Sequence, residues 1–403
     1  MPSYATHDSG YSMTSSPTLH ILKHLIAFDT TSSKSNLALM SYIQSYLELH
    51  GVASKLIYND EMTKANLFAT IGPQEKPGVM LSGHTDTVPV LGQRWHRDPY
   101  QLSQKAGLVY GRGTADMKGF IAVVLAAVPQ FVSQQLFAPV HLAFSFDEEI
   151  GCIGVRRLIE TLTQHPIKPG VCIIGEPTSM KVVTAHKGKV AVRVTVHGKE
   201  CHSGMAPRGV NAINYAAHLI IWLEQLASAK RDQGPYDQSY DIPYTTVHVG
   251  TISGGNALNI VPNLTAFDFE IRNIGIESAD EILAHFKDYA ENISTQMQKL
   301  DAGCAIEVNV IAQYPGLVTS DNKQAINFVR KLTASNDEAS INFGTEGGLF
   351  NHALGVPTVV CGPGSMEQGH KPDEFIELEQ LRQCELFMQR LVEQLRSRSV
   401  WDN

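Results

Sequence analysis

The sequence lacks the features that define several large protein classes. Its six cysteines are scattered over 403 residues without a CxxC pair, which fits reduced thiols in a cytoplasmic protein better than a disulfide framework. There is no run of basic residues and the net charge is −8, which argues against nucleic acid or an anionic membrane surface as a partner. The longest apolar stretch, around residues 119–132, is too short to span a bilayer and predicts a buried helix.

Familiar catalytic and targeting motifs are also missing. The sequence has no GxSxG and no HExxH, which disfavours serine hydrolases and thermolysin-like proteases. The glycine-rich segment GRGTADMKG lacks the third glycine of a dinucleotide loop and the GK[ST] ending of a P-loop. Residues 1–16 are polar and rich in Ser and Thr, without the apolar stretch of a signal peptide, and we expect a flexible tail there.

The pattern of apolar residues predicts an α/β domain at both ends of the chain. Short apolar strands alternate with helical stretches up to about residue 185, and this alternation resumes after about residue 314, ending in a helix near 378–396. The first strands are expected at 54–58, 66–71, 78–82, 140–146 and 171–174, and helices at 118–134 and 154–163. We predict a mixed sheet with a mostly parallel core, flanked by helices.

A different pattern occupies the middle of the chain. Residues 187–197 alternate apolar and polar side chains, as in a strand with one face in water. A helix (209–226), two strands (245–252 and 264–271), a helix (279–297) and a strand (305–312) follow. The order βαββαβ predicts a ferredoxin-like α+β domain, residues 186–314, inserted into a main domain of residues 17–185 and 315–403.

Ligand-type side chains follow five of the apolar segments of the main domain. In open α/β sheets, ligands bind beyond the carboxyl ends of the strands, so these five side chains are expected to meet at one edge. Two histidines and three carboxylates there predict a two-metal hydrolytic site, with Zn²⁺ favoured and Co²⁺ or Mn²⁺ plausible. The residues are His84, Asp116, Glu149, Glu176 and His370.

The motifs around these residues resemble those of the M20 family of dinuclear metallohydrolases. They are HTDTVP, GRGTADMKG, DEEIG, GEP and GHKPDE, which occur in the family's order along nearly the whole chain. The resemblance implies a zinc-peptidase-like catalytic domain with an inserted lid and dimerisation domain, and a homodimer formed through that lid. It also implies that Asp116 bridges two metals, with His84 and Glu176 completing one site and Glu149 and His370 the other.

Three further residues gain expected roles. Asp86, two residues after His84, would share a face with it on a strand-like segment and orient its ring, although a turn-forming Asp is the alternative. Glu148 matches the family's general base, and the residues alone do not distinguish it from Glu149. His202 matches the lid histidine that the family places over the partner subunit's site as an oxyanion donor, the alternative being an ordinary loop histidine.

The substrate has to be inferred from residues outside the metal site. Asn259 and Arg272 resemble the lid residues that hold a substrate carboxylate, and a surface arginine of a strand is the alternative for Arg272. The segment GTEGGLF resembles the acetylornithine deacetylase branch, where Glu346 could meet a substrate ammonium. A carboxylate favoured by a helix N-terminus is the alternative for Glu346.

The resemblance implies a metal-dependent enzyme that removes an N-acyl group from an amino acid. The specific expectation is hydrolysis of N2-acetyl-L-ornithine to L-ornithine and acetate, a step of arginine biosynthesis. The alternatives within the family are a succinyl-diaminopimelate desuccinylase, a broad aminoacylase or a dipeptidase. A more distant alternative is a non-catalytic, metal-stabilised amino-acid-binding protein.

Overall fold

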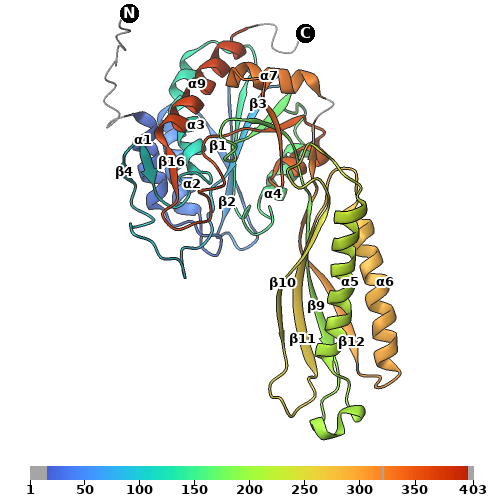
Figure 1. The fold of residues 1–403 in the computed structure, drawn as a ribbon. Helices are drawn as coiled ribbons and strands as arrows, with labels where there is room; N and C mark the ends of the chain where they lie inside the picture. The colour runs from blue at the N-terminus through green and yellow to red at the C-terminus, as the bar shows by residue number, and fades with distance from the viewer. Residues whose placement is uncertain (1–15, 320–321, 398–403) are drawn as a thin grey trace, which may run out of the picture.

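The computed structural model describes residues 16–319 and 322–397, which form a body and a long arm (Figure 1). The tail predicted at residues 1–16 lies outside the described residues apart from Ser16. The Ser16 hydroxyl accepts a hydrogen bond from the Leu19 amide and so caps the first helix, α1 (Pro17–Ala27). None of the helices in the described ranges is both long enough and apolar enough to cross a membrane.

The body is built on a nine-stranded mixed sheet. Its four central strands run parallel to one another, and most pairings outside them are antiparallel, which confirms the predicted sheet type. In spatial order the strands are β1 (Ser54–Tyr58), β2 (Ala65–Ile71), β6 (Val140–Ser145), β3 (Val79–His84), β7 (Val171–Ile174), β15 (Thr358–Val360), β8 (Val182–His186) and β13 (Leu317–Val318), with β14 (Glu338–Ile341) also on β8.

Helices cover both faces of this sheet. Because side chains alternate along a strand, Leu81 of β3 packs into one core and its neighbour Met80 into the other. The larger core lies against α1, α2 (Leu37–Leu49), α3 (Lys118–Ser133), α7 (Lys323–Thr333) and α9 (Leu378–Leu395), and the smaller one against α4 (Val155–Thr163) and α8 (Gly347–Leu354). A small sheet of β4 (Ser103–Lys105), β5 (Leu108–Tyr110) and β16 (Phe375–Glu377) completes the body.

The arm is a four-stranded antiparallel sheet covered on one face by two helices (Figure 1). Val190, Val192, Val194 and Val196 of the central strand are all buried against these helices, as their alternation with polar residues predicts. The elements are β9 (Lys189–His197), α5 (Ala212–Gln233), β10 (Thr246–Gly254), β11 (Leu264–Arg272), α6 (Ala279–Gln298) and β12 (Ala305–Tyr314), and the strand order is β10-β11-β9-β12. This is the βαββαβ arrangement of a ferredoxin-like sandwich.

The helix predicted at 209–226 differs from the helix observed. A short 3-10 segment, η2 (Ser203–Arg208), comes first, and α5 begins only after Asn211, whose side chain accepts hydrogen bonds from the Ile213 and Asn214 amides. The helix then continues to Gln233 because residues such as Lys230 and Arg231 favour helix, and it ends at Gly234, whose φ is +76°.

Candidate metal centre

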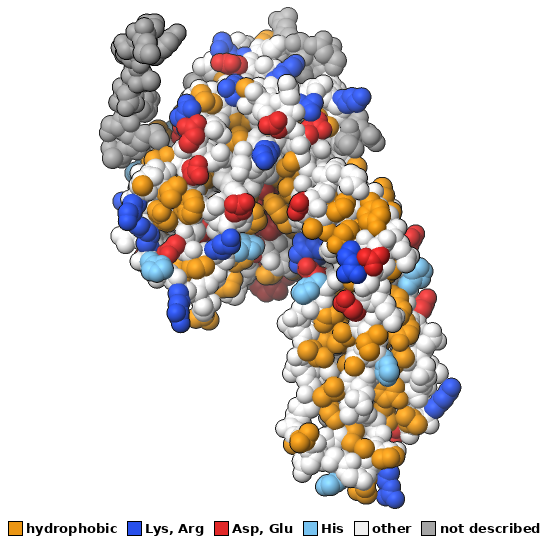
Figure 2. All heavy atoms as spheres, viewed as in Figure 1, with side chains coloured by type: hydrophobic (Ala, Val, Ile, Leu, Met, Phe, Trp, Pro, Cys, Tyr) orange, Lys and Arg blue, Asp and Glu red, His pale blue; other side chains and the backbone are white. Residues whose placement is uncertain are grey.

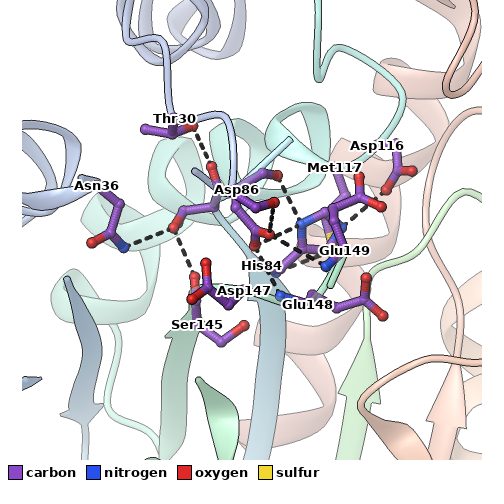
Figure 3. Close-up of polar contacts among 12 residues, drawn as sticks. Thr30, Asn36, His84, Asp86, Asp116, Met117, Ser145, Asp147, Glu148 and Glu149 are labelled. Atoms are coloured by element: carbon purple, nitrogen blue, oxygen red, sulfur yellow. Dashed lines mark hydrogen bonds and ion pairs between the residues drawn. The ribbon is translucent and has the colours of Figure 1, made fainter. Parts of the chain in front are cut away.

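The predicted ligands meet where three parallel strands of the body end. His84 is the last residue of β3, the segment Asp147–Glu149 follows β6, and Glu176 follows β7. Since β6, β3 and β7 are neighbours and run in the same direction, their carboxyl ends share one edge of the sheet. Figure 3 shows His84, Asp86, Asp116 and Glu149 grouped at this edge.

Asp116 faces two histidines with its two carboxylate oxygens. Its Oδ1 lies 3.0 Å from His84 Nε2, and Glu176 Oε1 lies 3.6 Å from the same nitrogen. Its Oδ2 lies 3.1 Å from His370 Nε2, which is also 3.0 Å from Glu149 Oε2. Each histidine therefore has one oxygen of Asp116 and one oxygen of a separate glutamate. This is the arrangement that a carboxylate shared between two cations requires.

The donor atoms fit divalent cations. Ligand atoms of His84, Asp116 and Glu149 lie within 4.8 Å of one another, and so do those of His84, Glu148 and Glu176. The oxygens Glu149 Oε1 and Glu176 Oε1 are buried without a hydrogen-bond partner. A buried carboxylate oxygen without a partner is costly, and a bound cation would satisfy it.

Burial and mutual repulsion hold the glutamates of the site toward their protonated forms. Burial raises the pKa of Glu148 to about 8, and the nearby charge of Glu149 adds to this effect. Burial raises the pKa of Glu149 to about 7, with repulsion from Asp116, and raises the pKa of Glu176 well above its ordinary value. When its four carboxylates are deprotonated, the group carries more negative charge than its two histidines balance, which is the electrostatic condition that attracts cations.

The histidines and Asp116 shift toward their charged forms. Hydrogen bonds to Asp116 and Glu149 raise the pKa of His370 to about 10. Burial lowers the pKa of His84, but the charges of Glu176 and Asp116 outweigh it and raise that pKa well above its usual value. For Asp116, burial is outweighed by hydrogen bonds from His370 and His84, which depress its pKa. In the metal-free chain these charges stabilise one another where metals would otherwise lie.

Asp86 contacts both His84 and the turn after β6, by a route that differs in part from the prediction. β3 ends at His84, so the two residues do not share the face of one strand. The His84 Nδ1 atom lies 2.9 Å from the main-chain oxygen of Asp86 and 3.5 Å from its carboxylate. That carboxylate accepts hydrogen bonds from the Glu148 and Glu149 amides at 3.1 and 3.3 Å (Figure 3). Asp86 therefore fixes the His84 ring mainly through its backbone, and the glutamate turn through its side chain.

The turn after β6 separates the surroundings of Glu148 and Glu149. Both residues lie beyond the strand, because β6 stops at Ser145, and the chain turns at Asp147, whose φ is +56°. Glu149 lies against His370, whereas the Glu148 carboxylate accepts a hydrogen bond from Cys152 Sγ at 3.3 Å. Their different contacts come from this turn and not from strand alternation.

Arg272 lies across the metal-ligand cluster at the body end of the arm. A cavity of about 140 Å³ is lined by Asp116, Glu148 and His370 on one side and by Arg272 on the other. Figure 2 shows acidic side chains recessed in the hollow where the arm meets the body, with basic ones beside them. Two atoms of the Arg272 guanidinium, Nε and Nη2, bond the Glu270 carboxylate at 2.9 and 3.2 Å. The opposite edge of the guanidinium, formed by Nη1 and Nη2, is turned away from Glu270, and Tyr314 of β12 also interacts with Arg272.

Sequence reasoning missed several residues of this cavity. Lys189 and Tyr314 stand at the body ends of β9 and β12, and Phe343 and Met366 lie in connecting segments of the body. The alternation of β9 and β12 identified them as strands, but no pattern marked which end of each strand meets the body. These residues can be identified as cavity residues only once the position of the arm on the body is known.

His202 and Asn259 lie at the other end of the arm. His202 precedes η2 and its Nδ1 accepts a hydrogen bond from the Gly204 amide at 3.0 Å, while the Ser203 amide donates to the main-chain oxygen of Asn259 at 3.0 Å. The nine residues of β11, roughly 30 Å of strand, separate this end from Arg272 (Figure 1). Within one chain, Asn259 and Arg272 therefore do not hold the same carboxylate, contrary to the expectation.

Glu346 lies beneath the site and does not face the cavity. It is 1% exposed, directly precedes α8, and accepts hydrogen bonds from Ser145 of β6 and, at 3.3 Å, from Ser82 of β3. Burial raises its pKa to about 7. The expectation that it meets a substrate ammonium does not match these contacts, because its carboxylate is already engaged by two serines. Its position at the start of α8 agrees with the alternative, a carboxylate favoured by a helix N-terminus.

Comparison with known proteins gives consistent matches. The model of peptidase family M20/M25/M40 matches residues 80–394. An acetylornithine deacetylase of Pasteurella multocida is 34% identical, over 93% of this chain and 97% of the relative, and one of Proteus mirabilis is 32% identical, over 91% and 92%.

Solved structures share the fold at lower identity. A tripeptidase of Staphylococcus aureus has a TM-score of 0.74 at 21% identity, covering 94% of this chain and 98% of its own. An M20 family metallo-carboxypeptidase of Sulfolobus solfataricus has a TM-score of 0.74 at 19% identity, covering 93% and 98%. A dinuclear metal-binding M20 peptidase of Bacillus subtilis has a TM-score of 0.64 at 15% identity, covering 94% and 97%.

Proposed function

The chain belongs to peptidase family M20/M25/M40, and from this membership and the metal-ligand cluster we propose that it hydrolyses the N-acyl amide of an amino acid. The substrate we propose is N2-acetyl-L-ornithine, which would give L-ornithine and acetate for arginine biosynthesis in the cytoplasm. The observation that carries the proposal is the Asp116 carboxylate, shared between His84 and His370, at one end of a cavity that Arg272 closes.

Two divalent cations, most plausibly Zn²⁺ given the imidazole and carboxylate donors, would be held at this cluster. His84, Asp116 and Glu176 would hold one ion, and His370, Asp116 and Glu149 the other. When bound, such a pair polarises an acyl carbonyl and lowers the pKa of a water.

Glu148 is proposed to move the proton. Its raised pKa, about 8, matches a group that accepts a proton from the attacking water near neutral pH and then donates it to the departing amine. The Cys152 thiol contact and the Asp86 bond to its amide hold the residue at the cavity wall. Among the described residues its carboxylate forms no ion pair with a histidine, so it is available for proton transfer.

Arg272 is proposed to hold the substrate carboxylate. Glu270 accepts hydrogen bonds from Nε and Nη2 of the guanidinium, which leaves Nη1 and the second hydrogen of Nη2 to form a paired hydrogen bond with a carboxylate in the cavity. Holding the substrate at this end would place its acyl group toward Glu148 and the cluster.

We also propose that the enzyme is a homodimer in which His202 serves the partner's site. His202 stands at the far end of the arm, surrounded by exposed apolar side chains including Met205, Leu258 and Ile260, which are 46%, 101% and 43% exposed. Exposed apolar residues in one place favour an interface. A partner's His202 and Asn259 could then stabilise the oxyanion and the substrate carboxylate from a second chain.

Deacetylation of acetylornithine has support from the two bacterial relatives, whose names give that activity. The peptidases among the solved structures are less than 25% identical and bear on the fold alone. A desuccinylase, an aminoacylase and a dipeptidase would use the same cluster, as would a binding protein without turnover.

A substrate panel with metal analysis on one preparation tests the proposal. Initial rates would be compared for N2-acetyl-L-ornithine, succinyl-diaminopimelate, N-acetyl-L-methionine and a dipeptide, on protein analysed for bound metal. We expect about two metal ions per chain and the highest kcat/KM for acetylornithine. A higher kcat/KM for one of the other three compounds would make that compound the proposed substrate instead. Metal binding without turnover of any of the four compounds would support a binding protein.

A further inference from the structure

A buried carboxylate that is not a proposed metal ligand is hydrogen-bonded to the loop that carries Asp116. Glu374 is 1% exposed, and its Oε1 accepts hydrogen bonds from the Ala115 and Asp116 amides at 2.9 and 3.1 Å. Its Oε2 accepts from Arg112 Nη1 at 2.7 Å and from the Gly113 amide at 3.1 Å. Four donors from one stretch of five residues thus converge on a single side chain, and one of them is the amide of the residue that faces both histidines.

Arg112 extends these contacts to the loop that carries His370. Its guanidinium donates to the Lys371 oxygen at 3.3 Å and to the Gln93 side-chain oxygen, and lies 4.9 Å over the Trp95 ring. Gln93 in turn donates to the His370 oxygen at 2.7 Å. A continuous chain of hydrogen bonds therefore runs from the Asp116 amide through Glu374, Arg112 and Gln93 to the backbone of His370.

We propose that Glu374 and Arg112 are positioning residues that fix the spacing between Asp116 and His370 and so set the metal affinity of the His370 side of the centre. This inference rests on the two-metal function proposed above. It assigns these residues no contact with substrate or with the reacting atoms.

The other half of the cluster is held by different contacts. His84 is the last residue of β3 and is fixed by the Asp86 backbone, and Glu176 follows β7 directly. In the described part of the chain, neither His84 nor Glu176 is hydrogen-bonded to Glu374, Arg112 or Gln93. Loss of the network should therefore affect the two metal sites unequally, which a general loss of stability would not.

Stability alone does not explain the buried ion pair between Arg112 and Glu374. A buried ion pair adds little net stability compared with apolar residues of the same size, because both charges lose their hydration. Here Glu374 accepts hydrogen bonds from the loop amides of Gly113, Ala115 and Asp116. Apolar side chains could not replace these bonds. Outer contacts of this kind that orient ligands typically change metal affinity by about 10–100-fold when removed.

Metal titration of two variants tests the inference. Glu374→Gln keeps the size of the side chain but turns an amide nitrogen toward donors. Gln93→Ala leaves Glu374 in place and removes the partly exposed side chain that joins Arg112 and Trp95 to the His370 oxygen. The control is Glu379→Gln. Glu379 lies five residues after Glu374 and forms an exposed ion pair with Arg382. Metal-free protein of each form would be titrated with Zn²⁺ by calorimetry, with Trp95 fluorescence as a second readout.

For Glu374→Gln we expect the first equivalent to bind as in the wild type and the second to bind about 10–100-fold more weakly. Gln93→Ala should shift the second equivalent in the same direction by a smaller factor, and the control should match the wild type. Equal weakening of both equivalents, or no change in Gln93→Ala, would overturn the inference. If Glu374→Gln does not fold, the Zn²⁺ titration of Gln93→Ala alone tests the inference. Failure of the wild type to bind two equivalents would instead contradict the proposed function.

Discussion

Glu148 and Glu149 are adjacent and identical side chains, yet the turn after β6 gives them different partners. The positive φ of Asp147 and the Asp86 carboxylate, which accepts hydrogen bonds from both amides, fix this turn. Glu149 is left against His370 and Glu148 against Cys152. One glutamate can thus serve a metal while its neighbour remains available for proton transfer.

Replacing Glu148 should therefore separate turnover from metal binding. In Glu148→Gln we expect kcat to fall by about 10²–10⁴-fold while two metal ions remain bound, because an amide cannot accept and return the proton. Activity assays and metal analysis of the same sample measure both effects. The matched variant Glu149→Gln should lose metal first from the His370 side. Loss of metal from Glu148→Gln would mean that the two roles are exchanged, and unchanged turnover would exclude Glu148 as the base.

The sequence predicts residues that follow strands better than residues that act through loops. His84 and Glu176 come at or directly after buried strands, so the parallel order of those strands was enough to bring them together. Glu374 and Arg112 act through amides and carbonyls of irregular loops, and no periodicity in the sequence encodes such contacts. Glu346 was wrongly expected to face the cavity because a glycine-rich turn does not reveal which way its side chains point.

At the scale of elements, the end of β7 is fixed by a close approach to α3. A Cβ atom on Gly175 would lie 2.1 Å from two atoms of the Phe120 ring, which is buried in α3. The Gly175 amide donates to the Ser82 oxygen of β3 at 3.0 Å. Gly175 therefore allows sheet and helix to approach closely at the residue before Glu176.

Gly175→Ala should weaken both the fold and the His84 side of the metal centre. Overpacking against Phe120 is expected to cost about 1–3 kcal/mol of the free energy of unfolding, and the shift of β7 should displace Glu176. Urea denaturation and Zn²⁺ titration measure the two effects. Gly250→Ala is the control, because the nearest atom to its added Cβ is 3.9 Å away. Equal stability of the two variants would show that Phe120 moves aside without cost.

Long elements were predicted and short ones were missed, for physical reasons. The helices α3 and α9 and the strands of the arm are long enough for their period to be visible in the sequence. β8 was not predicted, and the strand predicted at 187–197 is β9, which begins at Lys189; only Lys187 and Gly188 separate the two strands. β13 and β14 have two and four residues and take their pairing from β8, so nothing local predicts them.

At the scale of the whole molecule, metal binding should be linked to pH. The pKa values of Glu149 and His370, about 7 and about 10, are both above their ordinary values, so the metal-free fold holds protons that metals must displace. The raised glutamate pKa makes the metal-free fold lose stability as pH rises above about 4.5, and the favourable contribution of His370, complete below about 6.5, is lost through about 10. Both changes increase the difference in stability between the metal-loaded and the metal-free protein as pH rises.

The stabilisation by Zn²⁺ should accordingly increase between about pH 5.5 and 8. The difference in melting temperature between zinc-loaded and chelator-treated protein, measured at each pH, checks this. Buried groups away from the site, such as His141, whose pKa burial lowers to about 4, cancel in the difference. A difference that stays constant or shrinks with rising pH would mean that these ligands are not protonated in the metal-free protein.

The length of the arm decides whether one chain can form a complete site. His202 stands at the end of the arm that is remote from Arg272, so in the proposed homodimer it should act on the partner's site (Figure 1). His202→Ala and Glu148→Gln should each be nearly inactive alone. After the two are unfolded together and refolded, half of the dimers would be mixed and contain one intact site, which gives about a quarter of wild-type activity. No recovery, in a sample where mass analysis shows mixed dimers, would mean that His202 does not cross to the partner.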